Sequence, residues 1–179
     1  MTIASQARRL AKLLAQQGRK VVFAESCTGG LVSGALTAIP GISRHHCGGV
    51  VVYRNETKTA YLGIQRQILH DPGPVSPQVA TLMALRVLKK TPEADLALSV
   101  TGHLGPDAPR ELDGQVYLAI ATRPSPRSSR LTSTAHSLNC AKIVGRSPRQ
   151  RWVVEDALTL LADYLQQTPS TRTSATPRL

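Results

Sequence analysis

Apolar residues recur along this chain in two spacings, one typical of helices and the other typical of buried strands. Over residues 5–17 they return at every third or fourth position, which predicts an amphipathic helix that ends at Gly18. Residues 20–24 are a nearly continuous apolar run, which is typical of a strand covered on both faces, as in a parallel sheet between helices. The pattern therefore predicts a helix followed by a central strand.

The same two spacings predict the remaining elements. We expect further helices over residues 31–39, 55–62, 77–90 and 150–166. We expect further strands over residues 49–53, 94–101, 114–122 and 130–136, the last of them at an edge of the sheet. The connecting segments 42–49, 65–74 and 123–129 are expected to be loops.

This order of elements predicts the fold class. It implies an α/β fold, a three-layer α/β/α sandwich around a mixed sheet of about five strands. We place the domain over residues 1–167. Residues 168–179 are rich in Ser, Thr, Pro and Arg and contain almost no large apolar residue, so we expect a mobile basic tail there.

Composition supports a single domain with its own core, since the chain has 179 residues of which 41% are hydrophobic. No apolar run approaches the roughly 18 residues that a membrane span needs, and residues 1–18 lack the continuous apolar core of a signal peptide. We therefore expect a cytoplasmic protein that does not associate with a membrane.

The net charge of +11 raises the question of a nucleic-acid partner. The excess lies at the two ends, in residues 1–20 and from Arg123 onwards, while the segment between them is balanced. Such an excess either attracts nucleic acid or simply keeps the protein soluble. With one Phe, one Trp and four Tyr, the chain has few aromatic platforms on which bases could stack, which disfavours nucleic acid as a partner.

The cysteines and histidines indicate neither disulfides nor a metal. Cys27, Cys47 and Cys140 are an odd number without CxxC spacing, so we expect free thiols. His45 and His46 directly precede Cys47, but adjacent side chains point apart and no acid lies in that loop. We expect no metal site there.

The candidate chemistry begins where the first predicted strand meets the second predicted helix, in the segment Ala24-Glu25-Ser26-Cys27-Thr28-Gly29-Gly30. A turn of this kind directs backbone N–H groups and the positive end of a helix dipole at one small volume, where they can hold an anion or an oxyanion. The alternative is an ordinary helix cap made by Ser26 or Thr28. A second glycine-rich turn, Gly102–Pro106, follows another buried strand.

Tyr53 and Lys58 are further candidates, at the end of a predicted strand and in the helix after it. Taken alone, they are more typical of a strand-edge aromatic and of a solvated helical cation. The spacing does not decide whether the strand ends that carry Ser26 and Tyr53 share one edge of the sheet.

The order of these motifs resembles that of the CinA C-terminal domain family. The resemblance runs from about Ser5 to Leu165, and the residues that carry it are Ala24–Gly30, Pro40-Gly41, Tyr53-x-Asn55-Glu56-x-Lys58, Leu62-Gly63, Val75-Ser76 and Thr101-Gly102-x-x-Gly105-Pro106. It implies a stand-alone version of this domain, without the amino-terminal nucleotide-hydrolase domain of full-length members. It further implies hydrolysis of the amide of nicotinamide mononucleotide to nicotinate mononucleotide and ammonia, in pyridine-nucleotide recycling.

Carried over position by position, the resemblance implies that Ser26 is the nucleophile and that Tyr53 and Lys58 activate it. It implies no metal, no cofactor and a homo-oligomer. The substrate-binding positions that it implies are Glu25, Cys27, Thr28, Gly29, Gly30, Asn55, Thr101, Gly102 and Gly105.

Elementary chemistry agrees with these roles. A serine hydroxyl is a weak nucleophile until a base removes its proton, and a lysine with a lowered pKa can be that base, with a tyrosine hydroxyl to relay or orient the proton. The amides around Thr28–Gly30 are candidates for the oxyanion site. Cys27 would have a lowered pKa at a helix N-terminus and is the rival nucleophile. The resemblance assigns the role to Ser26.

Two segments depart from the family pattern. Where the family has Ile-Ala between the glycines of the second turn, this chain has His103-Leu104, followed by Asp107-Ala108-Pro109. The family's Gly-Asp-Arg before the last helix is here Gly145-Arg146-Ser147, which lacks the acid and leaves the arginine unplaced. A changed substrate, or a catalytically silent member that binds a nucleotide or a protein, is therefore the alternative hypothesis.

Overall fold

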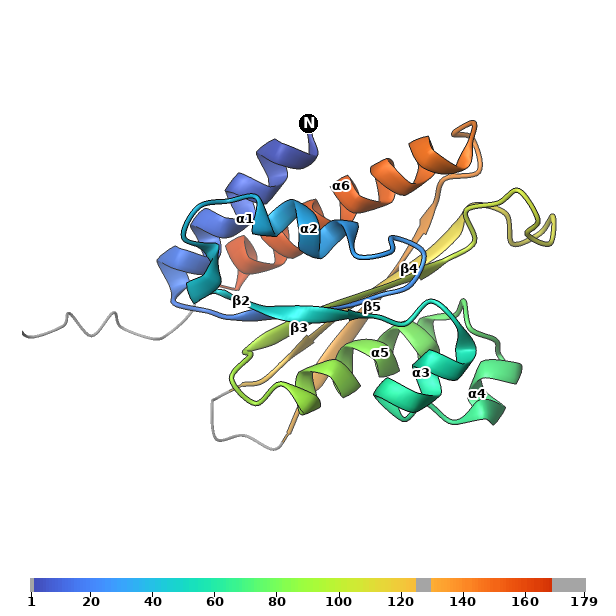
Figure 1. Cartoon of the computed structure of the whole chain (residues 1–179), viewed down its shortest axis with the longest axis horizontal. Coiled ribbons are helices and arrows are strands. Elements are labelled where there is room, and N and C mark those ends of the chain that lie inside the picture. Colours follow the sequence, from blue (N-terminus) through green and yellow to red (C-terminus); the bar gives the residue numbers. More distant parts are fainter. Residues whose placement is uncertain (1, 125–129, 169–179) are drawn as a thin grey trace, which may run out of the picture.

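A mixed five-stranded sheet forms the centre of the computed structural model, which describes residues 2–124 and 130–168 (Figure 1). The strand order is β2-β1-β3-β4-β5. Strands β2 and β3 pair parallel with β1, whereas β4 pairs antiparallel with both β3 and β5. The strands are β1 (Val21–Glu25), β2 (His46–Val51), β3 (Leu96–Gly102), β4 (Gln115–Thr122) and β5 (Thr132–Asn139).

Helices cover both faces of this sheet (Figure 1). One layer contains α1 (Ile3–Gln17), α2 (Leu31–Thr37) and α6 (Arg146–Gln167), and the other contains α3 (Asn55–Leu62), α4 (Arg66–His70) and α5 (Pro77–Lys90). Successive residues of β1 face opposite cores: Val21 and Phe23 pack toward α1 and α6, and Val22 and Ala24 toward α5. The α/β/α sandwich predicted from the sequence is confirmed.

Local signals fixed several boundaries as predicted. Gly18 ends α1 in the left-handed conformation at φ 59°. Ser76 caps α5, where its Oγ accepts a hydrogen bond from the backbone N–H of Val79 at 3.3 Å, and Pro77 follows at the first helical position. Helix α3 spans Asn55–Leu62, as expected.

Three boundaries were predicted wrongly. Strand β2 begins at His46, inside the expected loop, because His46 already pairs with Val21 of β1; its ring packs edge-on against Phe23 with the centroids 5.3 Å apart. The expected loop 65–74 contains the short helix α4. Helix α6 begins at Arg146 rather than at residue 150, because Pro148 lies in the first helical turn, where its missing N–H removes no helical hydrogen bond.

The remaining expectations concern segments that the structure describes in part. The proposed tail, from residue 169 onwards, and residues 125–129 of the expected loop lie outside the described residues. Strand β5 lies at an edge of the sheet, as predicted. Among the described helices, none combines the length and the apolar character that crossing a bilayer requires.

Candidate active site

Three parallel strands bring the sequence motifs to one edge of the sheet. Because β1, β2 and β3 run in the same direction, the residues that follow them lie together, as at the ligand sites of open α/β sheets. A cavity of about 300 Å³ opens at this edge. Among the predicted site residues, those that line it are Ser26, Cys27, Tyr53, Asn55, Lys58, Thr101, Gly102 and Gly105.

Ser26 and Lys58 form a direct contact in this cavity. The Lys58 Nζ donates a hydrogen bond to Ser26 Oγ at 3.2 Å and another to the backbone carbonyl of Tyr53 at 3.2 Å. Both side chains are buried, with 2% of Lys58 and 7% of Ser26 exposed. Burial lowers the pKa of Lys58 to about 8, because desolvation disfavours its ammonium form. A hydroxyl beside a buried lysine of this kind is the arrangement of an activated serine.

The hydroxyl of Tyr53 has a different partner. It accepts a hydrogen bond from the Arg146 guanidinium at 2.8 Å, and 56% of the tyrosine is exposed. The contact between Tyr53 and Lys58 is made by the tyrosine's backbone carbonyl. The structure therefore ties Tyr53 to Lys58 through its main chain and to Arg146 through its side chain.

Arg146 is the site residue that the sequence left unplaced. It lines the cavity from the first turn of α6, and its Nη1 donates to the carbonyl of Gly105 at 2.7 Å. Gly145-Arg146-Ser147 therefore supplies a guanidinium to the site, which places the arginine that the sequence had left unplaced. The signal that could have found it was Pro148, since a proline in a first turn would have allowed an earlier start for α6.

The carboxylate of Glu25 accepts hydrogen bonds from the backbone N–H groups at the beginning of α2. One carboxylate oxygen accepts hydrogen bonds from Thr28 Oγ1 at 2.7 Å, from Gly30 N–H at 2.9 Å and from Val32 N–H at 3.2 Å. The other accepts from Ser33 N–H at 2.8 Å. The positive end of α2 is thus occupied by a buried carboxylate, and the N–H of Gly30 is not free for an oxyanion.

Four of the predicted substrate-binding residues therefore lie away from the cavity lining. Glu25, Thr28 and Gly30 hold the turn together, and Gly29 donates its N–H to the carbonyl of Ser26 at 3.0 Å. The backbone N–H of Cys27, which does line the cavity, pairs with no carbonyl among the described residues. It is the amide of this turn best placed to meet a developing oxyanion.

The pKa of the Cys27 thiol is raised, whereas the sequence led us to expect a lowered pKa. Burial raises its pKa to about 12, and only 3% of the residue is exposed. The expected lowering required an uncompensated helix N-terminus, but Glu25 neutralises that end of α2. Since the thiolate is the nucleophilic form, this raised pKa disfavours Cys27 as the nucleophile and favours Ser26.

The second glycine-rich turn contributes shape rather than hydroxyl groups. Thr101 is buried and uses its Oγ1 to donate to the carbonyl of Pro74 at 2.9 Å, which anchors the segment before α5. A Cβ on Gly102 would lie 2.7 Å from a methyl carbon of Val116, so only glycine fits there. His103 lines the cavity, and burial lowers its pKa, so its imidazole is neutral near pH 7.

Comparison with known proteins decides which family these residues represent. A sequence model of the CinA C-terminal domain matches residues 3–165. The chain belongs to the CinA C-terminal domain family. It is 45% identical over 111 residues to a CinA-like protein of Desulfotalea psychrophila, a match that covers 61% of this chain and 27% of that protein. A CinA-like protein of Citrifermentans bemidjiense is 42% identical over 124 residues, covering 68% of this chain and 30% of that protein.

Solved CinA structures share the fold. The competence/damage inducible protein CihA from Agrobacterium tumefaciens superposes with a TM-score of 0.82 at 35% identity, over 92% of this chain and 96% of that one. A competence or damage-inducible protein from Enterobacter asburiae gives 0.78 at 26% identity, over 92% and 99% of the two chains. The chain spans less than a third of the length of the CinA-like relatives that it matches by sequence.

A contact between Ser33 and His46, elsewhere in this CinA domain, does not form a catalytic pair. Ser33 Oγ lies 2.8 Å from His46 Nε2, while His46 Nδ1 accepts a hydrogen bond from Gly48 N–H at 3.2 Å. A neutral ring that accepts at Nδ1 carries its proton on Nε2, so His46 donates to Ser33 and cannot remove its proton. Burial lowers the pKa of His46, which favours this neutral form.

Proposed function

We propose that this protein is an amidohydrolase that converts nicotinamide mononucleotide to nicotinate mononucleotide and ammonia, with Ser26 as nucleophile. The observation that carries the proposal is the buried contact between Lys58 Nζ and Ser26 Oγ, together with the lowered pKa of that lysine. Membership of the CinA family supports it. We assign the activity to one domain over residues 1–167.

The reaction follows from this contact. Neutral Lys58 accepts the proton of Ser26 as Oγ attacks the carboxamide carbon, and the carbonyl oxygen becomes an oxyanion facing the N–H of Cys27. The lysine then gives its proton to the nitrogen as the carbon–nitrogen bond breaks, so ammonia leaves and an ester with Ser26 remains. Water, deprotonated by the again neutral Lys58, hydrolyses this ester to the carboxylate. Tyr53 is an activating partner in this mechanism: its carbonyl accepts a hydrogen bond from Lys58, and its hydroxyl accepts one from Arg146.

The walls of the cavity suit a small phosphorylated amide. Arg146 carries a permanent charge, and its N–H groups beyond those bonded to Gly105 and Tyr53 have no acceptor among the described residues. A guanidinium with unused donors is a strong phosphate ligand. A volume of about 300 Å³ lies at the small end of the range for ligand pockets.

A substrate-shifted or catalytically silent member of the family is the second candidate. His103 favours it, because this imidazole lines the cavity where the family pattern has an aliphatic residue.

We further propose a cytoplasmic homo-oligomer. This part of the proposal rests on the family resemblance described above.

One experiment separates the two functions. The purified protein is incubated with nicotinamide mononucleotide, and both ammonia and nicotinate mononucleotide are measured. We expect equimolar release of both, and none with Ser26→Ala. Turnover that equals the Ser26→Ala background would reject the amidohydrolase, and calorimetric binding of the nucleotide to that inactive protein would then support the silent binding protein.

A further inference from the structure

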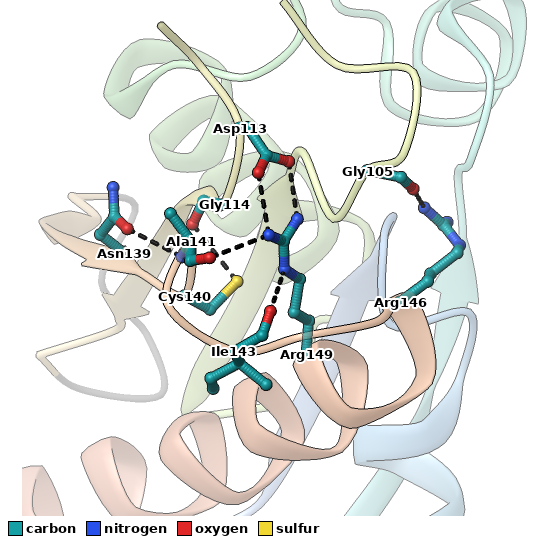
Figure 2. Close-up of polar contacts among 9 residues, drawn as sticks. All are labelled: Gly105, Asp113, Gly114, Asn139, Cys140, Ala141, Ile143, Arg146 and Arg149. Atoms are coloured by element: carbon teal, nitrogen blue, oxygen red, sulfur yellow. Dashed lines mark hydrogen bonds and ion pairs between the residues drawn. The ribbon is translucent and has the colours of Figure 1, made fainter. Parts of the chain in front are cut away.

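Arg149 makes four hydrogen bonds near the cavity and has no part in the proposed mechanism (Figure 2). Its Nη1 and Nη2 donate to the two carboxylate oxygens of Asp113 at 2.6 and 2.8 Å. Its Nε donates to the carbonyl of Ile143 at 2.7 Å, and its Nη2 also donates to that of Ala141 at 3.0 Å. One guanidinium thus joins the loop before β4, the loop after β5 and the first turns of α6.

Gly105 packs directly on this ion pair. A Cβ at Gly105 would lie 2.9 Å from Arg149 Nη1 and 3.0 Å from Asp113 Oδ1, so the ion pair lies close beside this glycine and leaves no room for a side chain. The carbonyl of the same glycine accepts the hydrogen bond from Arg146. The ion pair therefore supports the backbone group that Arg146 reaches.

Arg146 and Arg149 are three residues apart in the first turns of α6, which places them on neighbouring parts of one helical face. Figure 2 shows Arg149 directed at Asp113 and Arg146 directed at Gly105. The ion pair consequently holds two parts of the structure in place: the first turn of α6, which carries Arg146, and the loop with Gly105, whose carbonyl Arg146 contacts.

We propose that Asp113 and Arg149 are positioning residues that hold Arg146 against Tyr53 at the mouth of the cavity. The inference rests on the proposed function for its kinetic consequence. Both side chains of the Asp113–Arg149 pair are mostly buried, with 31% of the Asp113 and 11% of the Arg149 side chain exposed. The fixed, two-pronged geometry of the pair makes orientation its main effect.

Asp113→Asn and Arg149→Lys test this role. Asp113→Asn removes the carboxylate charge, whereas Arg149→Lys keeps the positive charge and loses the forked geometry. Both are expected to lower kcat/KM for nicotinamide mononucleotide by roughly ten- to a hundredfold, the scale of a small misplacement at an active site. Asp163→Asn is the matched control, because Asp163 pairs with Arg9 at 2.6 Å near the opposite end of the same helix. It should leave kcat/KM unchanged.

A double-mutant cycle distinguishes positioning from a general structural effect. If Asp113 acts through Arg146, Asp113→Asn causes no further loss of kcat/KM in an Arg146→Met protein. An equal loss in both backgrounds, or no loss in the wild-type background, would overturn the proposal.

A readout without turnover keeps the test independent of the proposed function. The guanidinium N–H signals of Arg146 are recorded by NMR in the wild type and in the Asp113→Asn and Asp163→Asn variants. We expect them to broaden or disappear only in Asp113→Asn. Unchanged Arg146 signals in that variant would refute the positioning role, whereas a wild type that holds Arg146 and does not hydrolyse the nucleotide would refute only the proposed function.

Discussion

Lys58 is the base of the proposed mechanism, and its buried charge also has a cost in stability. Its hydrogen-bond partners are a hydroxyl and a carbonyl, and no carboxylate of the described residues pairs with it, so burial is the main cause of its lowered pKa. A lysine at its ordinary pKa near 10.4 would be protonated at neutral pH and useless as a base. The sequence named this residue only through a family resemblance, because a lysine in a short polar helix has no local signature of burial.

The first prediction is the pH dependence of turnover. Because the neutral lysine is the base, kcat/KM should rise with pH through an apparent pKa near 8. The value for kcat should be lower still, because the positive pyridinium ring of the bound substrate also disfavours the ammonium form. Lys58→Arg and Lys58→Met should both lose turnover far more than binding, measured by steady-state kinetics and calorimetry. Near-normal turnover of Lys58→Arg would remove Lys58 from the role of base.

The second prediction concerns stability, which can be measured without any substrate. At pH 7 the folded protein buries an ammonium that the unfolded chain exposes, so Lys58→Met should stabilise the protein by up to about 3 kcal/mol. Between pH 8 and 10.5 the folded lysine is neutral while the unfolded lysine is still charged, so the wild type gains stability with rising pH. The difference should therefore fade by pH 10.5 in urea titrations. A destabilised Lys58→Met at pH 7 would contradict the lowered pKa.

The third prediction separates Cys27 from Ser26. Cys27→Ala should keep most of the turnover and lose about 1–2 kcal/mol of stability, because it leaves a small cavity in the core. Ser26→Ala should lose turnover without that loss of stability. Native Cys27 should resist iodoacetamide, since its pKa of about 12 leaves almost no thiolate at neutral pH. Rapid alkylation of Cys27 together with loss of turnover in Cys27→Ala would indicate a thiol mechanism.

At the scale of elements, the join between β1 and α2 was predicted in place but not in detail. The sequence indicated a turn rich in N–H groups at residues 24–30, and the structure has that turn. The group that accepts hydrogen bonds from this turn is set by the rotamer of Glu25, whose carboxylate points at the first N–H groups of α2. No pattern in the sequence specifies such a rotamer, so amides expected to face substrate are used internally.

The fourth prediction tests this internal cap. Glu25→Gln replaces a carboxylate that accepts from three backbone N–H groups and one hydroxyl by an amide with a single acceptor oxygen. We expect a loss of about 1–3 kcal/mol in chemical unfolding. Glu56→Gln is the control, because the Glu56 carboxylate is 70% exposed and should contribute less than about 1 kcal/mol. Equal effects of the two substitutions would argue against the cap.

The limits of sequence reasoning are clearest for α6 and the cavity. Periodicity predicted the apolar face of α6, because packing on α1 and the sheet requires it. The residues of α6 that precede this apolar pattern are polar apart from Pro148, so periodicity could not show that the helix already begins at Arg146. The parallel order of β2, β1 and β3 was likewise left open by the spacing, although this order is what brings Ser26, Tyr53 and Gly102 to one edge.

At the scale of the whole molecule, the site is assembled from distant segments with a positive side chain at its mouth. Lys58 and Ser26 are 32 residues apart, and Arg146 is 93 residues from Tyr53, whose hydroxyl it contacts. The chain as a whole carries a net charge of +11. An anionic substrate should therefore be attracted before it binds.

The last prediction uses salt to measure this attraction. Because salt screens exposed charges over about 8–10 Å, kcat/KM for nicotinamide mononucleotide should fall severalfold between low and high ionic strength. Nicotinamide riboside, which lacks the phosphate but keeps the positive pyridinium ring, should be a poor substrate whose kcat/KM does not fall as salt is added, because salt screens repulsion rather than attraction. Arg146→Gln should reduce the salt dependence for the nucleotide, whereas Arg54→Gln should not, because Arg54 is paired with Glu56 on the surface. If salt affected nucleotide and riboside equally, the phosphate would have no cationic subsite, and the charge of the chain would have to be explained by another partner, such as a nucleic acid with its much steeper salt dependence.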